Sequence, residues 1–438
     1  MSRFESIRTG TTGSYLGFYF ASCITTAMFG GAMTWHFITE SLFFDLVNGQ
    51  YSTIAYIILA WTCMGWLMCL IVGIGFDVLP LIHGSSPFHQ ESMRQFLLTN
   101  VFGQTLLFAS TFMDTVERIE EFATLGIAFL ALAVFLLGKP GRDLYTDSEV
   151  KSGGDEVGIL SFAPGLALPF FAGMVLICWF LRGSAGMLDL GMSVMVMFYM
   201  MLTIVIVVSH FNRRLNWSIV HPKRIPLQFG IFFVLSALHV LFSFLAGRED
   251  AGTNTLLTQM KNYSMGLAFL FAFLICNPVK IAKKAWTGER MAHNQLIFAA
   301  IWMLPFSAFH AFNSGSYLDR PGTPGYTIFI STSALLAVWG YAQYLHLDHL
   351  HINIHKRKTN IPFILCFLIG FVAIQVLFIK NWLQLGSTDV EQSVWIVSLT
   401  LGALIMMFNF TRQTMLSFDT WHRIPMFYGR YNQPKSEN

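Results

Sequence analysis

Apolar residues along the chain are gathered into about twelve long runs separated by short polar gaps. A helix needs about 20 residues to cross the hydrocarbon core of a bilayer, and each run has about that length. The pattern therefore predicts an all-α polytopic membrane protein, a bundle of about twelve transmembrane helices. The runs lie near residues 14–36, 52–76, 95–113, 121–138, 159–181, 187–209, 226–246, 262–281, 294–312, 326–347, 361–380 and 393–411.

Basic residues are distributed unevenly between the gaps. Of the 27 Lys and Arg residues, 21 lie at the two ends of the chain or in every second gap. Positively charged loops are retained on the cytoplasmic side of a membrane. The asymmetry therefore predicts that the N- and C-termini are both cytoplasmic. The six basic residues assigned to the outer side are Arg118, Arg182, Arg248, Lys261, Arg320 and Lys380.

Composition agrees with a location in lipid. Hydrophobic residues make up 54% of the chain and charged residues 12%, whereas soluble domains carry about 25% charged residues. We predict one integral-membrane domain over residues 1–438, with a flexible cytoplasmic loop at 139–158 and a cytoplasmic tail at 412–438. The expected location is the inner membrane of a bacterial or archaeal cell. Orientation and anionic lipid headgroups account for the basic gaps, so no nucleic-acid partner is predicted.

The sequence lacks the motifs of several classes of binding site and enzyme. All six cysteines lie within apolar runs and form no CxxC pair, which indicates packing residues rather than disulfides or thiolate metal sites. The chain contains no Walker motif, no GxSxG elbow, no HExxH and no Rossmann fingerprint. These absences argue against a pump driven by ATP from this chain alone.

The third apolar run carries a polar stripe. Asn100, Gln104, Thr111 and Asp114 fall within about 80° of arc at roughly 100° per residue. Polar groups that face lipid have no partners, so the stripe should face the bundle interior or a wet cavity. It could line a substrate path, or its amides and hydroxyls could bond neighbouring helices as a structural feature.

The seventh run repeats this arrangement with Gln228, Ser236, His239 and Ser243 on one side. His239 is the deepest titratable group that the pattern predicts. No Asp, Glu, Lys or Arg lies at the middle of any predicted span, and Asp189 is near a span end. Carriers coupled to ions or protons commonly keep an ionisable residue at depth. The pattern therefore argues against simple carboxylate-based coupling.

Two spans contain residues that could interrupt a helix. Pro164 and Pro169 both fall in the fifth run, and Gly73, Gly75 and Pro80 crowd the end of the second. Proline within a span frees backbone groups that can line a site. Proline is also common in membrane helices that carry no site.

The histidines suggest two candidate metal or haem sites, because imidazole is a common ligand of transition metals. An outer site would use His36, His239 and His310, with Asp114 at a similar depth. The alternative is that these histidines are separate and lie at the membrane interface or bond neighbouring helices. An inner site would use the dense stretch that contains His346, His349, His351 and His355.

The second run ends in the turn Asp77-Val78-Leu79-Pro80-Leu81-Ile82-His83-Gly84. This turn resembles the equivalent turn of the haem–copper oxidase superfamily and its NnrS-like relatives, which are also built from about twelve helices with both ends inside. The resemblance covers about ten residues and implies a histidine-liganded redox protein. The second span has no histidine, the seventh has one rather than an adjacent pair, and the tenth lacks paired outer histidines. No ligand residue is therefore carried over.

Three functions follow from these patterns. The first is a transporter or permease for a neutral or amphipathic small molecule, with the stripes of the third and seventh spans lining the path. The second is a membrane redox protein that holds haem or a transition metal. The third is a non-catalytic subunit of a membrane complex, in which 43 Phe and 22 Met provide an adaptable surface for lipid or for other membrane subunits.

Overall fold

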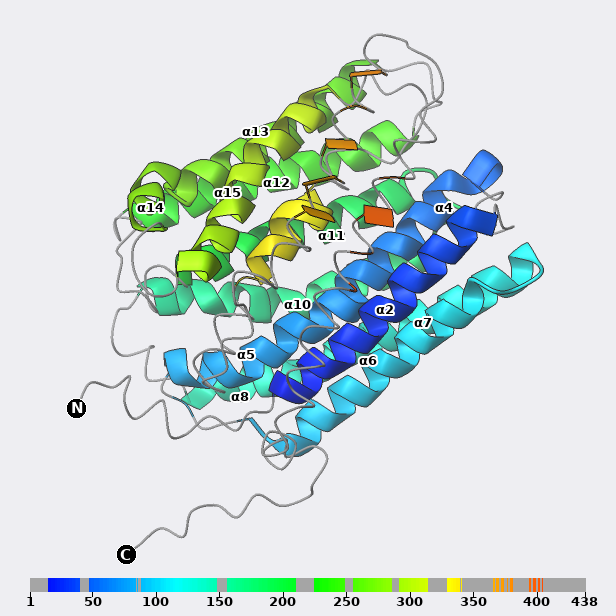
Figure 1. Cartoon of the computed structure of the whole chain (residues 1–438), viewed down its shortest axis with the longest axis horizontal. Coiled ribbons are helices and arrows are strands. Elements are labelled where there is room, and N and C mark those ends of the chain that lie inside the picture. The colour runs from blue at the N-terminus through cyan, green and yellow to red at the C-terminus, as the bar shows by residue number, and fades with distance from the viewer. Residues whose placement is uncertain are drawn as a thin grey trace, which may run out of the picture.

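The computed structural model describes most of the first 313 residues and part of the remainder. The described residues are 15–39, 47–83, 85, 88–147, 156–209, 224–248, 255–285, 291–313, 329–338 and 340, with scattered residues between 365 and 404. Every regular element in these ranges is a helix (Figure 1). The inner histidines His346, His349, His351 and His355 and the predicted tail at 412–438 lie outside the described residues.

The helices follow the predicted runs from the first to the ninth, and η5 lies in the tenth. Their bounds are α2 (Tyr15–Thr39), α4 (Val47–Ala60), η1 (Trp61–Trp66), α5 (Leu67–His83), α6 (Gln90–Ser110), α7 (Val116–Leu136), α8 (Gly138–Asp147), α10 (Glu156–Phe180), α11 (Met187–Ser209), α12 (Ile225–Arg248), α13 (Thr255–Ile275), α14 (Pro278–Ala285), α15 (Met291–Phe312) and η5 (Phe329–Ala334).

Five helical segments in the described part of the chain are long and apolar enough to cross a membrane. They are Thr53–Phe76, Val116–Thr146, Met187–Val208, Leu227–Arg248 and Asn294–Phe312. Phe20–Met33 and Ala167–Phe180 are shorter apolar segments. The prediction of an all-helical chain is thus confirmed for these ranges, and these helices suit a membrane by length and composition.

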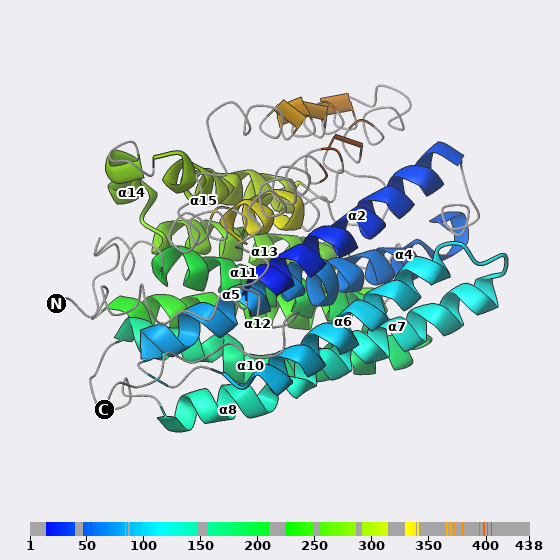
Figure 2. The ribbon, with the colours of Figure 1, turned by 60° about the horizontal axis from the view of Figure 1, so that its bottom comes forward.

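The centre of the bundle is formed by α11 and the α4–η1–α5 segment. In the apolar spans, 89% of the α11 segment and 83% of the α4–α5 segment are buried, against 28% of the α12 segment. α11 contacts α10, α12 and α4, so it connects the two sides of the bundle (Figures 1 and 2). Burial of this degree on all sides requires residues that are apolar around the whole helix.

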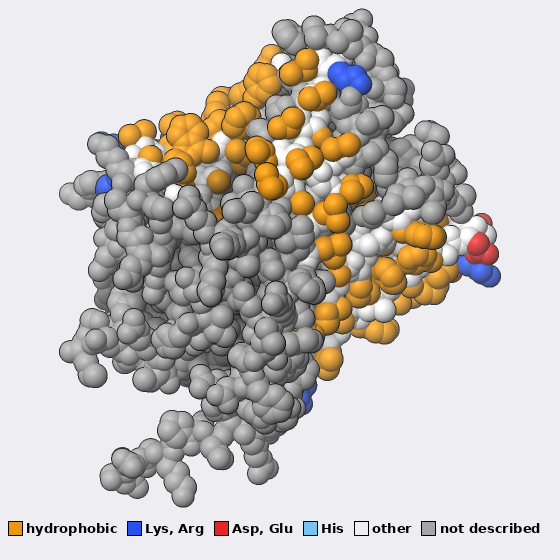
Figure 3. All heavy atoms as spheres, viewed as in Figure 1, with side chains coloured by type: hydrophobic (Ala, Val, Ile, Leu, Met, Phe, Trp, Pro, Cys, Tyr) orange, Lys and Arg blue, Asp and Glu red, His pale blue; other side chains and the backbone are white. Residues whose placement is uncertain are grey.

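The outer faces of the peripheral helices are apolar as well. On α12, Leu227, Val234 and Leu241 are among the large hydrophobic side chains that are exposed. Figure 3 shows apolar side chains along the helices, with Lys, Arg, Asp and Glu gathered near helix ends. Such a surface suits contact with lipid chains rather than with water.

Helices α13 and α8 depart from the predicted segments. α13 covers 255–275 instead of 262–281. It ends before Asn277, which has a left-handed backbone (φ 45°) and is followed by Pro278. Lys261 is therefore the seventh residue of a helix. In addition, α8 occupies the first half of the segment predicted as a flexible loop at 139–158; it packs against α10 and buries Leu144.

Helices α6 and α7 approach each other closely through two glycines. A Cβ added at Gly126 would lie 2.7 Å from Cγ of Leu107 and 3.0 Å from the carbonyl oxygen of Gly103. A Cβ added at Gly103 would lie 3.0 Å from the carbonyl oxygen of Gly126. Small residues at a crossing allow two membrane helices to pack backbone against backbone.

Replacing Gly126 by Ala is expected to destabilise the protein by about 1–3 kcal/mol, because the rigid backbone of Gly103 cannot move aside cheaply. Thermal unfolding in detergent, followed with a fluorogenic thiol dye that reports on the buried cysteines, measures the effect. Gly141→Ala is the matched control, since a Cβ there meets no atom within 4 Å. Equal melting temperatures for the two variants would contradict the expectation.

Candidate functional site

The second membrane span is interrupted halfway along its length. Between α4 and α5, residues 61–66 form a π-helical turn in which the backbone N–H of Leu67 donates to the carbonyl of Thr62. Gly65 has φ −90° and ψ −111°, which is not helical. All six residues of the turn are buried. A π-type turn changes the hydrogen-bond register and leaves backbone groups that need other partners.

The interruption is not at the residues that the sequence pattern indicated. α5 continues through Gly73, Gly75 and Pro80 to His83, and α10 continues through Pro164 and Pro169. Glycine alone does not end a helix that is packed on all sides, and a proline removes only its own backbone N–H donor, which membrane helices commonly tolerate.

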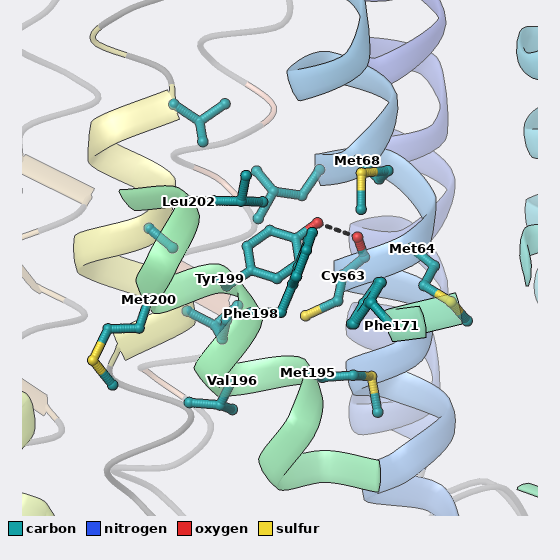
Figure 4. Packing of buried hydrophobic residues seen from close by; sticks show 14 of the residues in the cluster. Cys63, Met64, Met68, Phe171, Met195, Val196, Phe198, Tyr199, Met200 and Leu202 are labelled. Atoms are coloured by element: carbon teal, nitrogen blue, oxygen red, sulfur yellow. Dashed lines mark hydrogen bonds between the residues drawn. The ribbon is translucent and has the colours of Figure 1, made fainter. Parts of the chain in front are cut away.

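Side chains from three other helices bond the carbonyl groups at the interruption. The Tyr199 hydroxyl of α11 donates to the carbonyl of Cys63, as the dashed line in Figure 4 marks. Asn100 of α6 donates to the carbonyl of Met64 at 2.8 Å. Ser22 of α2 donates to the carbonyl of Trp66 at 2.8 Å. A membrane interior offers no water, so these bonds allow the irregular turn to exist there.

Asn100 and Gln104 extend this arrangement into a chain of hydrogen bonds. Gln104 Nε2 donates to Asn100 Oδ1 at 2.7 Å, and Trp61 Nε1 donates to Gln104 Oε1 at 3.3 Å. Neither amide side chain is exposed at all. A Cβ at Gly65 would lie 3.0 Å from Cδ of Gln104, so glycine at that position makes room for the amide.

The other half of the α6 stripe lies elsewhere. Thr111 is buried, and its hydroxyl donates to the carbonyl of Phe108 in its own helix at 2.7 Å. Asp114 lies beyond the end of α6, is exposed, and pairs with Arg118 at 3.1 Å. The four stripe residues therefore do not form one continuous polar surface. The substrate path predicted for them remains a prediction.

The stripe on α12 divides in a similar way. His239 is fully buried, with Nδ1 3.0 Å from the carbonyl oxygen of Lys261 and Nε2 3.5 Å from Oγ of Ser243. Gln228 Oε1 and Ser236 Oγ are buried and have no hydrogen-bond partner among the residues that the structure describes. His239 thus serves the contact between α12 and α13.

A largely buried ion pair lies beside His239. Lys261 Nζ of α13 is 3.1 Å from Asp189 Oδ1 of α11, and the side chains are only 12% and 21% exposed. The Lys261 carbonyl also accepts a hydrogen bond from Ser264 Oγ at 2.9 Å. Sequence reasoning placed Lys261 in a gap because it began the eighth span at 262. The Asn277-Pro278 pair, which ends α13, is the signal that would have moved the span.

The sequence pattern also missed several residues around the interruption: Ser22, Trp61, Gly65, Trp66 and Tyr199. The available signal was the segment Trp61-Thr62-Cys63-Met64-Gly65-Trp66, in which two tryptophans flank a glycine halfway along an apolar run. The segment can be identified as an interruption only from the bonds that α2, α6 and α11 make to it.

The predicted metal sites receive no support from the described part of the chain. No group of three or more His, Cys, Asp or Glu residues that could hold a metal ion occurs among the residues searched there. His310 is buried beside the ring of Phe309. His36 lies in α2, but its side chain is outside the description. The outer and inner histidine sites stay predictions.

Comparison with known proteins identifies no relative from which a function could be transferred. No protein-family model matches the chain, and the search of curated proteins finds no match. The interrupted second span and the bonds around it are therefore the strongest basis for a functional assignment.

Proposed function

We propose that this protein is a multi-pass membrane transporter or permease that moves a neutral or amphipathic small molecule, with its substrate site at the interrupted second span. The observation that carries the proposal is the buried turn at 61–66, centred in the span Thr53–Phe76. Transporters commonly bind substrate near the bilayer midplane, where a discontinuous helix exposes backbone groups to a site.

The groups at the interruption favour an uncharged substrate. The side chains that bond it belong to Ser22, Asn100, Gln104 and Tyr199, and all four are uncharged. An ion would need a compensating charge or several free carbonyl groups in so dry an environment. The carbonyl groups of Cys63, Met64 and Trp66 already accept hydrogen bonds from protein side chains.

Twelve spans with cytoplasmic termini, in a bacterial or archaeal inner membrane, form part of the same proposal. The bias of Lys and Arg toward the cytoplasmic gaps and the termini supports this orientation. Three of the basic residues assigned to the outer side have a carboxylate partner. These pairs are Arg118–Asp114 at 3.1 Å, Arg182–Glu120 at 2.6 Å and Lys261–Asp189 at 3.1 Å.

Membrane lipid is the partner proposed for the cytoplasmic ends of the helices. The contact of Phe102 with Phe129, at 4.7 Å between ring centroids, sets the register of α6 against α7. In that register Arg94 lies level with the start of α8, which carries Lys139 and Arg142. All three side chains are exposed. Anionic headgroups are attracted by such a cluster on the cytoplasmic face.

Uptake into proteoliposomes tests the transport function. With a panel of labelled neutral compounds, the Gln104→Leu variant is expected to lose at least about tenfold in uptake rate, since one buried hydrogen bond corresponds to about that factor. Thr105→Val is the matched control, because Thr105 is exposed on the same helix and its hydroxyl bonds only the carbonyl of Val101 in the contact that the structure gives. Wild-type uptake by Gln104→Leu would rule out the proposed site.

The absorption spectrum and the metal content of the purified protein distinguish the transporter from the alternative, a redox protein that holds haem or a transition metal. A haem band or a stoichiometric transition metal would favour the redox protein and overturn the transporter proposal. Firm co-purification of fixed membrane subunits, without uptake by the isolated chain, would favour the non-catalytic subunit.

A further inference from the structure

We propose that the substrate of this site is a flat, uncharged aromatic compound with a hydrogen-bond acceptor, and that the indole N–H of Trp66 donates to that acceptor. The inference rests on the function proposed above and adds the chemical class of the ligand and the residue that recognises it.

Three aromatic rings lie at the interrupted turn, two of them belonging to its first and last residues. The Phe29 ring of α2 meets the ring of Trp61 edge-on at 5.1 Å between centroids and lies 6.2 Å from the ring of Trp66. Trp61 is fully buried and Trp66 is 6% exposed. Phe29 thus connects the residue that begins the turn with the residue that ends it. Aromatic pairs prefer offset or edge-on geometry, so a flat aromatic ligand is a suitable further partner for these rings.

The two tryptophans differ in one respect. Trp61 Nε1 donates to Gln104 Oε1, whereas Trp66 Nε1 is buried and has no hydrogen-bond partner among the described residues. A buried indole N–H normally finds an acceptor, and leaving it without one carries a free-energy penalty. A ligand acceptor at Trp66 would remove that penalty, and this gain would be present only in the complex.

The neighbouring polar groups define what the ligand has to offer. Ser22, Asn100 and Tyr199 already donate to the carbonyl groups of the turn. Indole nitrogen donates and cannot accept, so the complementary group on the ligand is an acceptor such as a carbonyl oxygen or a ring nitrogen. The absence of charged side chains from the bonds described at the turn favours a neutral molecule.

The pair quinoline and naphthalene tests this recognition. The two molecules have the same shape, but only quinoline carries an acceptor, and it is neutral at pH 8. We expect the protein in lipid nanodiscs, titrated calorimetrically against empty nanodiscs, to bind quinoline about tenfold more tightly than naphthalene. Trp66→Phe keeps an aromatic ring and removes the N–H. It is expected to weaken quinoline binding about tenfold and to leave naphthalene binding unchanged.

Trp302→Phe is the matched control, since Trp302 is 42% exposed on α15 and packs against Phe273 and Phe298. It should bind both probes as the unaltered protein does. Equal quinoline affinity in the unaltered protein and Trp66→Phe would overturn the assignment of the donor. Equal loss of both probes would overturn it too, because it would reveal a packing role, as would failure of the unaltered protein to bind either probe.

The outcomes separate this inference from the proposed function. If uptake depends on Gln104 but quinoline has no advantage over naphthalene, the ligand class is wrong and the transport function stands. If Trp66 discriminates between the probes but no compound is transported, the recognition stands and the transport function is wrong.

Discussion

Replacement of Lys261 by Met is expected to lower the stability of the protein by about 2–4 kcal/mol, because it leaves the Asp189 carboxylate largely buried without a partner. The two groups join α11 to α13, and the Lys261 carbonyl also receives bonds from His239 and Ser264. The methionine keeps most of the apolar stem of lysine and therefore isolates the contribution of the charge. Thermal unfolding in detergent with the thiol dye measures the change.

The double variant Lys261→Met/Asp189→Asn distinguishes charge from packing. Removal of both charges leaves no unpaired ion, so most of the lost stability should return. Arg118→Gln is a second control, because the Arg118–Asp114 pair is exposed and its loss should cost less than about 1 kcal/mol. A double variant as unstable as the single one would mean that the unpaired Asp189 carboxylate is not the cause of the lost stability.

Asn100→Leu is expected to destabilise the protein by about 1–3 kcal/mol and to abolish uptake. The leucine has a similar volume but cannot donate to the Met64 carbonyl or accept from Gln104 Nε2. Two buried polar groups then lack partners in a region that water does not reach. Thermal unfolding and the proteoliposome assay measure the two effects independently.

Thr105→Val provides the comparison for this variant. Thr105 is an exposed residue of the same helix, and its hydroxyl bonds only the carbonyl of Val101 in the contact that the structure gives. The stability of the Thr105→Val variant should lie within about 0.5 kcal/mol of that of the unaltered protein. If Asn100→Leu behaved like Thr105→Val, the bond to Met64 would not hold the interrupted turn in place.

Most of the helix positions could be predicted from the sequence, because a span needs a continuous apolar run and each run in the described ranges contains a helix. Boundaries were less reliable. The predicted start of the eighth span at 262 left Lys261 outside the helix, whereas α13 begins at Thr255. In the sequence, a lysine inside a helix appears only as a break in an apolar run. The ion pair could not be predicted, because the partner Asp189 lies 72 residues away from Lys261.

The candidate site was only partly predictable. Helical periodicity correctly put Asn100 and Gln104 on one face, since residues four apart in a helix are neighbours, and they bond each other at 2.7 Å. The same periodicity put Thr111 and Asp114 on that face, although α6 ends at Ser110, before both residues, and Asp114 lies exposed beyond the helix. The position of the interruption was missed, because Gly73, Gly75 and Pro80 are stronger local signals than Gly65.

The sequence by itself determined that the chain is helical, that its helices suit a membrane, and which way the charge pattern favours their insertion. These properties depend on transfer of each segment from water to lipid, which is a local quantity. Only the tertiary structure decided where the second span departs from helical geometry, and that its carbonyl groups meet Ser22, Asn100 and Tyr199. An interruption is stable only when other helices supply its missing hydrogen bonds, and such contacts between distant residues are set by packing.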